Sequence, residues 1–142
     1  MNKKYVCYCG MYCENCVVKA QVEPASIVLH DIINRAGFEE VAHNNPDGAR
    51  FLRFLKLISE KGACTLCHNG SGNPVCAVRV CAKEKEIDMC AFCDDYPCDK
   101  LNDFFKVYPV LKDDNDLLRE KGMEKWIQMQ EERKENGYVY KN

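Results

Sequence analysis

Three cysteines near the N-terminus have a spacing that can hold an iron–sulfur cluster. Residues 9 to 16 read CGMYCENC, which places Cys9, Cys13 and Cys16 in the pattern C-x3-C-x2-C. Radical S-adenosylmethionine enzymes use this spacing to bind a 4Fe–4S cluster with one iron left open for the cofactor. Their partial barrel needs about six βα units, at roughly 30 residues for a βαβ unit. A chain of 142 residues is too short for that scaffold, so the spacing needs another explanation.

The chain as a whole is unusually rich in cysteine, with 11 among 142 residues. Such an excess arises from disulfides in an oxidising compartment or from metal ligands in a reducing one. The N-terminus MNKKYVCYCG has no apolar run of signal-peptide length, and no stretch is apolar enough for a membrane span. We therefore expect a soluble cytoplasmic protein that does not contact a membrane, and metal is the favoured explanation.

The close cysteine pairs match the way zinc is bound in proteins. Zinc prefers four tetrahedral thiolate or imidazole ligands, which turns of the form C-x2-4-C often supply in pairs. The chain has three such knuckles, CENC, CTLC and CAFC, and the last two are 22 residues apart, just outside the usual two-knuckle spacing. The cysteine count favours two zinc sites, but the sequence leaves open which ligands pair. The predicted metal ligands are Cys9, Cys13, Cys16, Cys64, Cys67, Cys76, Cys81, Cys90, Cys93 and Cys98.

Two other metal groups use similar ligands. An iron–sulfur cluster remains the main alternative to zinc, although the ferredoxin order of a final Cys-Pro is reversed here as Pro97-Cys98. The segment CTLCH at residues 64 to 68 also matches a c-type haem attachment site. Covalent haem belongs to exported proteins, so we expect His68 to be a surface residue or an occasional substitute ligand.

The charge of the cysteine-rich segment argues against nucleic-acid binding. The whole chain has a formal net charge of -2. Between Cys64 and Lys100, six acidic residues outnumber four basic ones, and thiolates around zinc would add further negative charge. Nucleic-acid binding needs a basic footprint that neutralises phosphates. We therefore expect the partner to be a protein or a small ligand.

The elements that must position these cysteines are predicted to be helices. Apolar residues at helical spacing predict helices over residues 25–36, 47–61 and 101–107, and a longer one over 113–135 that Gly122 interrupts or ends. A loop, GFEEVAHNNPDG, is expected between the first two helices. The fold class is therefore mainly α, with several helices and cysteine-rich, zinc-knuckle-like metal-binding loops. We expect one domain over residues 1–142.

Three further features bear on packing. The apolar arc of the 47–61 helix is wide, which predicts a position deep in the core. Trp126 is expected to be a core or helix-packing residue. The C-terminal stretch YVYKN is expected to be a strand or a docked tail.

These motifs resemble a family catalogued as domain of unknown function 3795. The resemblance lies in CGMYCENC, in CAVRVCAKEKEIDMCAFCDDYPCDKL from Cys76 to Leu101, and in the tail EKGMEKWIQMQ. It implies a cysteine-rich, zinc-binding protein whose matching cysteines are the ten predicted ligands, with Cys7 as an addition. It implies no particular activity.

The residues favour a binding role over catalysis. The chain has no H-E-x-x-H or H-x-E…P-C-x-x-C pattern. Catalytic zinc keeps a position open for water and usually has histidine or carboxylate ligands, whereas this set is nearly all sulfur. No catalytic residue is predicted. The first hypothesis is a binding module with two structural zinc sites. The alternative is a redox or sensor protein that uses an iron–sulfur cluster or its thiols.

Overall fold

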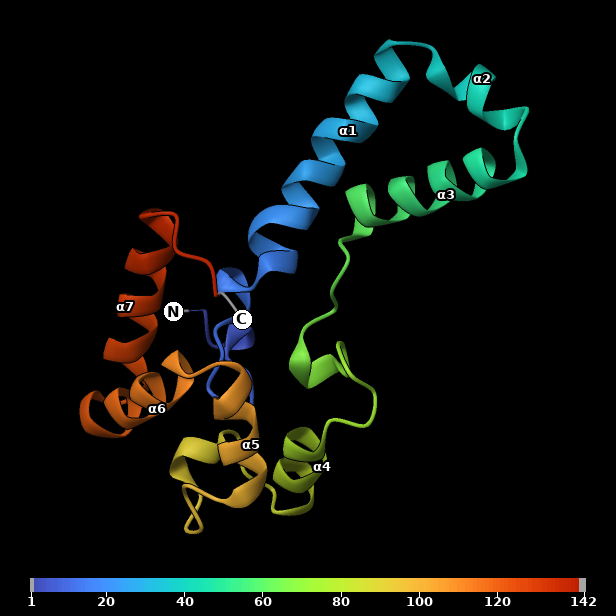
Figure 1. Ribbon diagram of the computed structural model, residues 1–142. Helices are drawn as coiled ribbons and strands as arrows, with labels where there is room; N and C mark the ends of the chain where they lie inside the picture. Colours follow the sequence, from blue (N-terminus) through green and yellow to red (C-terminus); the bar gives the residue numbers. More distant parts are fainter. Residues whose placement is uncertain (1, 141–142) are drawn as a thin grey trace. The chain divides into compact units, whose positions relative to one another are not determined.

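The computed structural model of the protein describes residues 2–140 (Figure 1). These residues have a mainly α-helical fold, which confirms the predicted class; their β-structure is limited to one isolated antiparallel bridge between Val6 and Tyr12. The chain divides into two compact units. We call Val17–Cys64 the helical unit, and Met1–Cys16 together with Thr65–Asn142 the cysteine unit. Two compact units can belong to one domain, so the single domain over 1–142 stays a prediction.

The helical unit contains three α-helices: α1 (Glu23–Arg35), α2 (Phe38–His43) and α3 (Pro46–Lys61). The caps explain where α3 begins, because the Asn45 side chain accepts a hydrogen bond of 2.9 Å from the Asp47 N–H, with Pro46 in the first turn. The predicted helices 25–36 and 47–61 are confirmed within two residues. The loop predicted between them is wrong in part, because Phe38–His43 forms α2.

Helices α1 and α3 run antiparallel and enclose a small core. The side chain of Glu23, at the start of α1, accepts hydrogen bonds from the N–H groups of Ala63 (2.9 Å) and Cys64 (3.1 Å), just after α3 ends. The buried core consists of Ile33, Ala42, Leu52 and Leu55. The expected deep burial of α3 is wrong, because Phe54 on its outer face is 61% exposed. The helical unit is too small to cover the wide apolar arc.

The cysteine unit is built from four α-helices and short 3-10 turns between them. Its helices are α4 (Ala77–Glu84), α5 (Asp99–Val107), α6 (Val110–Lys121) and α7 (Met123–Glu135). Gly122 separates α6 from α7 with φ +78°, so the predicted interruption is confirmed. Sequence reasoning missed α4, whose residues were assigned to a ligand-bearing loop.

Trp126 lies at the centre of a buried cluster, as predicted. It is fully buried with Val6, Tyr12, Leu118 and Ile127. The C-terminal tail docks through its backbone: the Tyr140 N–H donates to the Asn15 carbonyl at 2.9 Å. Residues 138–140 form a docked tail and no strand, and the last two residues of YVYKN lie outside the described residues. In the described part of the chain, no helix combines the length and apolarity needed to cross a membrane.

Candidate metal centre

Four cysteines of the cysteine unit line a single cavity of about 230 Å³. They come from three neighbouring elements. Cys81 lies on α4, Cys90 and Cys93 begin and follow the 3-10 turn Cys90–Phe92, and Cys98 caps the N-terminus of α5. The chain therefore brings four thiols to one place through one knuckle and two helices. We call Cys81, Cys90, Cys93 and Cys98 the cavity thiols.

Backbone hydrogen bonds hold these thiols in position. The Cys93 N–H donates to the Cys90 carbonyl at 3.1 Å, which closes the knuckle. The Cys98 carbonyl accepts from the N–H groups of Leu101 and Asn102 at 3.0 and 2.9 Å, as expected where a helix begins. The cavity thiols thus sit on hydrogen-bonded turns, where zinc knuckles commonly occur.

The surroundings of Cys90 disfavour its thiolate form. Burial, followed by the neighbouring Cys9, Cys98, Cys81 and Cys93, raises the pKa of Cys90 to about 12. Two lysines, Lys85 and Lys100, line the same cavity. The Lys85 ammonium lies 3.6 Å from the Cys93 sulfur and also pairs with Asp95. That ion pair with Asp95 is the main reason why the pKa of Lys85 is raised. Its charge is therefore already shared with a carboxylate.

A second cluster of thiols surrounds Cys7. The sulfurs of Cys7 and Cys13 are 3.2 Å apart. Hydrogen bonds to Cys13, Cys67 and Cys9, in that order, together with burial, raise the pKa of Cys7 well above its ordinary value. We call Cys7, Cys9, Cys13 and Cys67 the N-terminal thiols.

Cys67, another of the N-terminal thiols, has a pKa that is shifted in the opposite direction to that of Cys7. Its pKa is lowered to about 6, first by the hydrogen bond from the Cys7 thiol and then by the Tyr8 N–H, against the opposing effect of burial. His68 and Arg79 add smaller favourable charges. His68 is not the surface residue expected from sequence. It is half-buried, with its ring centroid 4.1 Å from that of Tyr8 and its Nε2 2.9 Å from the Val6 carbonyl.

A tight turn presents the N-terminal thiols, and α6 holds it. The Gly10 N–H donates to the Cys7 carbonyl at 3.0 Å, and Gly10 has φ +85°. The buried Asn115 amide donates to the carbonyls of Cys9 (3.0 Å) and Leu111 (2.6 Å). A Cβ at Gly10 would overlap the Asn115 side chain, so only glycine fits this close approach.

The two groups of thiols are linked through one backbone hydrogen bond and through Cys9, which lies near both groups. The Cys90 N–H donates to the Tyr8 carbonyl at 2.8 Å, which joins the knuckle to the N-terminal turn. Cys9 influences the pKa values of both Cys7 and Cys90. The cysteines from the two chain segments of the cysteine unit therefore form one continuous region.

The CTLC and CAFC knuckles contribute to different groups of thiols. Cys90 and Cys93 lie with Cys81 and Cys98, while Cys67 lies with the N-terminal cysteines. Cys7, which the resemblance treats as an addition, lies among the N-terminal thiols. Its C-x-C spacing from Cys9 is the sequence signal that could identify it. Cys76 precedes α4 and is partly buried against the same core.

The remaining predicted ligands are Cys16 and Cys64. Cys16 lies at the end of the first segment of the cysteine unit, and Cys64 is the last residue of the helical unit. None of the described residues forms a disulfide, and within residues 2–140 no three Cys, His, Asp or Glu side chains are arranged as a complete metal site. The ten-ligand assignment therefore stays a prediction.

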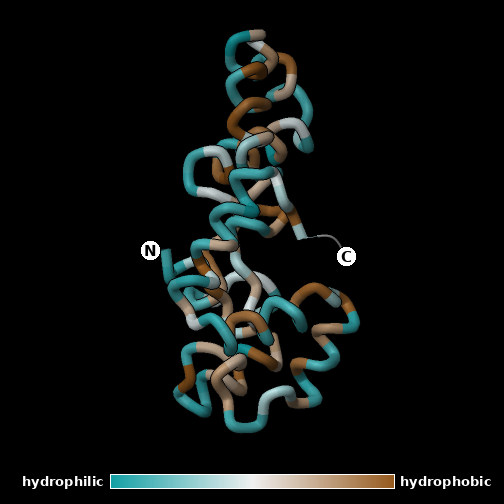
Figure 2. The backbone as a smooth tube through the Cα atoms, turned by 90° about the vertical axis from the view of Figure 1, so that its left-hand side faces the viewer, coloured by the Kyte–Doolittle hydropathy of each residue, from teal (hydrophilic) through white to brown (hydrophobic). Residues whose placement is uncertain are grey.

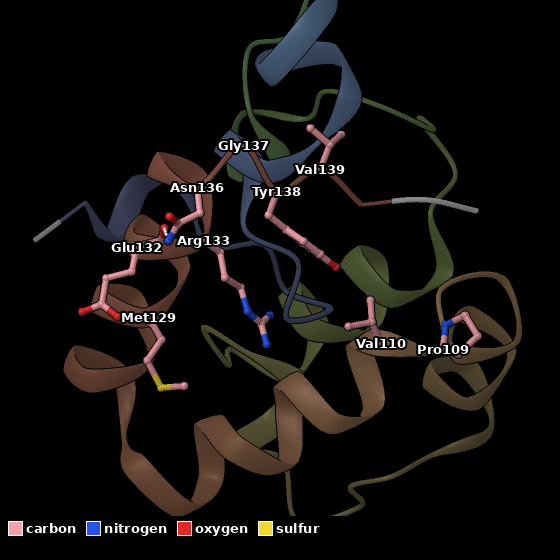
Figure 3. A pocket seen from close by; sticks show the side chains of 9 residues that line it. All are labelled: Pro109, Val110, Met129, Glu132, Arg133, Asn136, Gly137, Tyr138 and Val139. Atoms are coloured by element: carbon pink, nitrogen blue, oxygen red, sulfur yellow. Dashed lines mark hydrogen bonds between the residues drawn. The ribbon is translucent and has the colours of Figure 1, made fainter.

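A larger cavity of about 870 Å³ lies away from these thiols, between the start of α6, the end of α7 and the tail. Figure 3 shows the Arg133 side chain extending into it, with Tyr138 and Val110 nearby. The guanidinium donates to the buried Asp114 carboxylate at 2.6 Å and lies 5.4 Å from the Tyr138 ring centroid. Because Asp114 already neutralises this cation, the cavity shows no marked preference for an anion.

The fold and the clustered thiols define a small, mainly helical, cysteine-rich protein. A family model described as Protein of unknown function (DUF3795) matches residues 5–103, a range that includes all 11 cysteines. The chain belongs to this family. The tail motif EKGMEKWIQMQ lies beyond the matched range. Neither the curated proteins nor the solved structures include a match to this chain.

Proposed function

We propose that the protein is a metal-stabilised binding module in which the cavity thiols hold one zinc ion. The observation that carries this proposal is the convergence of Cys81, Cys90, Cys93 and Cys98 on a single cavity. Four sulfur donors satisfy the tetrahedral preference of zinc and leave no position for a catalytic water. The ion would therefore have a structural role.

The electrostatics of the cavity support the same proposal. Mutual repulsion and burial disfavour the thiolate of Cys90, and a divalent cation would reverse that balance by compensating the negative charge. The Lys85 ammonium beside Cys93 would offset part of the net charge of a zinc tetrathiolate.

A second zinc ion is proposed at the N-terminal thiols, in keeping with the two-site count. This site would draw on Cys7, Cys9, Cys13 and Cys67, which form one hydrogen-bonded group. Metal at both positions would tie the N-terminus to the segment that follows Thr65. The surface so stabilised would bind a protein or a small ligand.

The test is removal of the metal from the intact chain. Chelation of the purified protein is expected to lower its thermal midpoint and to reduce its helical signal. The reason is that a structural zinc ion binds only the folded chain, so its free energy of binding stabilises the fold. In a Cys93→Ser variant, which lacks one cavity thiol, the chelator should lower the thermal midpoint by less than it does in the native chain. An apo protein with the original fold and midpoint would rule out the structural role.

A thiol-based redox role is the second candidate, and the 3.2 Å separation of the Cys7 and Cys13 sulfurs favours it. A peroxide would accept two electrons and two protons from the two thiols, giving one S–S bond and two molecules of water or the corresponding alcohol and water. Mild peroxide should then remove two free thiols, and mass spectrometry should find Cys7 joined to Cys13. A peroxide-treated sample with no disulfide would exclude this role.

The iron–sulfur version of this alternative has its own test. Protein purified without oxygen would carry iron and absorb visible light if a cluster were bound. A colourless, iron-free sample would exclude the cluster.

A further inference from the structure

The helical unit has far more apolar surface than its own core can cover. Its buried core contains four side chains, whereas many large apolar side chains remain exposed. The exposed ones on the two long helices include Val28 (58%), Leu29 (42%), Ile32 (49%), Phe51 (45%) and Phe54 (61%). Exposed apolar patches of this kind mark interaction surfaces.

These side chains fall on one face of the unit. Val28, Leu29 and Ile32 are spaced i, i+1 and i+4 on α1, and Phe51 and Phe54 are spaced i and i+3 on α3. When each helix is viewed from its own N-terminus, its exposed stripe lies to the same side of its buried residues. Because α1 and α3 run antiparallel, the two stripes come to lie side by side on the same face. Figure 2 shows apolar residues recurring along these helices among polar ones. We call these five residues the apolar face.

The area of the apolar face suits a protein interface of standard size. At about half exposure of side chains of roughly 200 Å² each, the five residues expose about 500 Å². A stable interface buries about 800 Å² per partner, of which about 60% is apolar, so roughly 500 Å² is the apolar share. The face is therefore large enough for a stable complex.

The charges of the helical unit indicate what kind of partner the face suits. Residues 17–64 contain six basic and six acidic residues, so the unit has no net charge. Four of the six cations already pair with an acid on the same helix or turn, in the pairs Lys19–Glu23, Arg35–Asp31, Arg50–Asp47 and Lys56–Glu60. This balance gives no attraction to an anionic membrane or to nucleic acid, and it gives no repulsion between two copies.

We propose that the apolar face is a dimerisation surface that packs on the same face of a second copy of this chain. The helices α1 and α3 of each copy would form half of a four-helix layer related by a two-fold axis. In such an isologous interface Phe54 of each copy would pack against the apolar face of the other copy. The proposal does not rest on metal binding, since its residues all lie in the helical unit.

The experiment is a mass measurement of the full chain by light scattering at about 10 to 100 μM. We expect twice the 16.3 kDa of one chain. The double variant Val28→Glu/Phe54→Glu places a charge on each helix of the face and should weaken the dimer at least about 100-fold, to give the monomer mass. Val107→Glu, at a residue 51% exposed at the end of α5, is the matched control and should stay dimeric.

Two further measurements keep the result interpretable. Helical content and metal content should be the same in all the variants, which separates a failed interface from a failed fold or a lost metal site. Phe54→Ala, which adds no charge, should also weaken the dimer if the double variant does not fold. A monomeric native chain at 100 μM, or a dimer that persists in both face variants, would overturn the proposal. A monomer that binds some other molecule through this face would overturn it as well.

Discussion

The sharpest prediction concerns the turn that presents the N-terminal thiols. Substitution Gly10→Ala adds one methyl group at φ +85°, a backbone conformation that costs a non-glycine residue about 1 kcal/mol or more. The new Cβ would also overlap the Asn115 amide, which must move. That amide then loses its buried hydrogen bonds to the carbonyls of Cys9 and Leu111, at about 1 to 3 kcal/mol for a buried group left unpaired. The expected loss in the free energy of unfolding is about 3 kcal/mol.

The matched control is Gly37→Ala. Gly37 also has a positive φ, of +63°, but a Cβ there meets nothing within 4 Å. It should lose only the backbone contribution of about 1 kcal/mol. Urea unfolding of the two variants and the native chain gives both differences from the midpoints and slopes. Equal losses in the two variants would refute the inference that Asn115 packs under the turn and holds Cys9 in place.

Three other perturbations have defined outcomes. Trp126→Ala should lower the free energy of unfolding by about 3 to 5 kcal/mol in urea, because the indole is fully buried; a loss below 1 kcal/mol would contradict that burial. In metal-free protein, Cys7→Ala should shift the midpoint of Cys67 alkylation from about pH 6 toward pH 9, since the Cys7 thiol is the main cause of the lowered pKa; an unchanged profile would exclude this hydrogen bond. Arg133→Leu should destabilise the fold by about 3 kcal/mol at pH 7 and by less at pH 4. Burial already raises the pKa of Asp114, so without Arg133 this carboxyl becomes protonated on mild acidification. The destabilisation caused by an unpaired buried carboxylate then disappears as the pH falls. A loss of unfolding free energy that did not depend on pH would count against an ionised Asp114.

The positions of the long helices could be predicted because the residues that begin and end them lie next to them in the sequence. Asn45 and Pro46 begin α3 and Gly62 follows it, and these are capping signals that act within a few residues. Helix α2 was missed because its six residues are too few for a clear period and lie between Gly37 and the turn-like sequence NNPDG. Helix α4 was missed because Cys81 led to the interpretation of its segment as a metal-binding loop.

The grouping of the cysteines could not be predicted in the same way. The presence of clustered thiols follows from composition and knuckle spacing, which are local features of the sequence. Which thiols meet depends on contacts between distant segments, such as the hydrogen bond from the Cys90 N–H to the Tyr8 carbonyl. It also depends on α4, which brings Cys81 to the Cys90–Cys93 knuckle. The exposure of Phe54 was missed for a similar reason, because the number of neighbours that cover a helix is a property of the whole unit.

The central claim is that the cavity thiols hold a structural zinc ion. The most direct measurement is elemental analysis of the chain purified without oxygen, beside the variant Cys90→Ser purified in the same way. We predict two zinc ions per native chain, no iron, and one zinc fewer in the variant. A native protein with no bound metal, or with iron in place of zinc, would contradict the account.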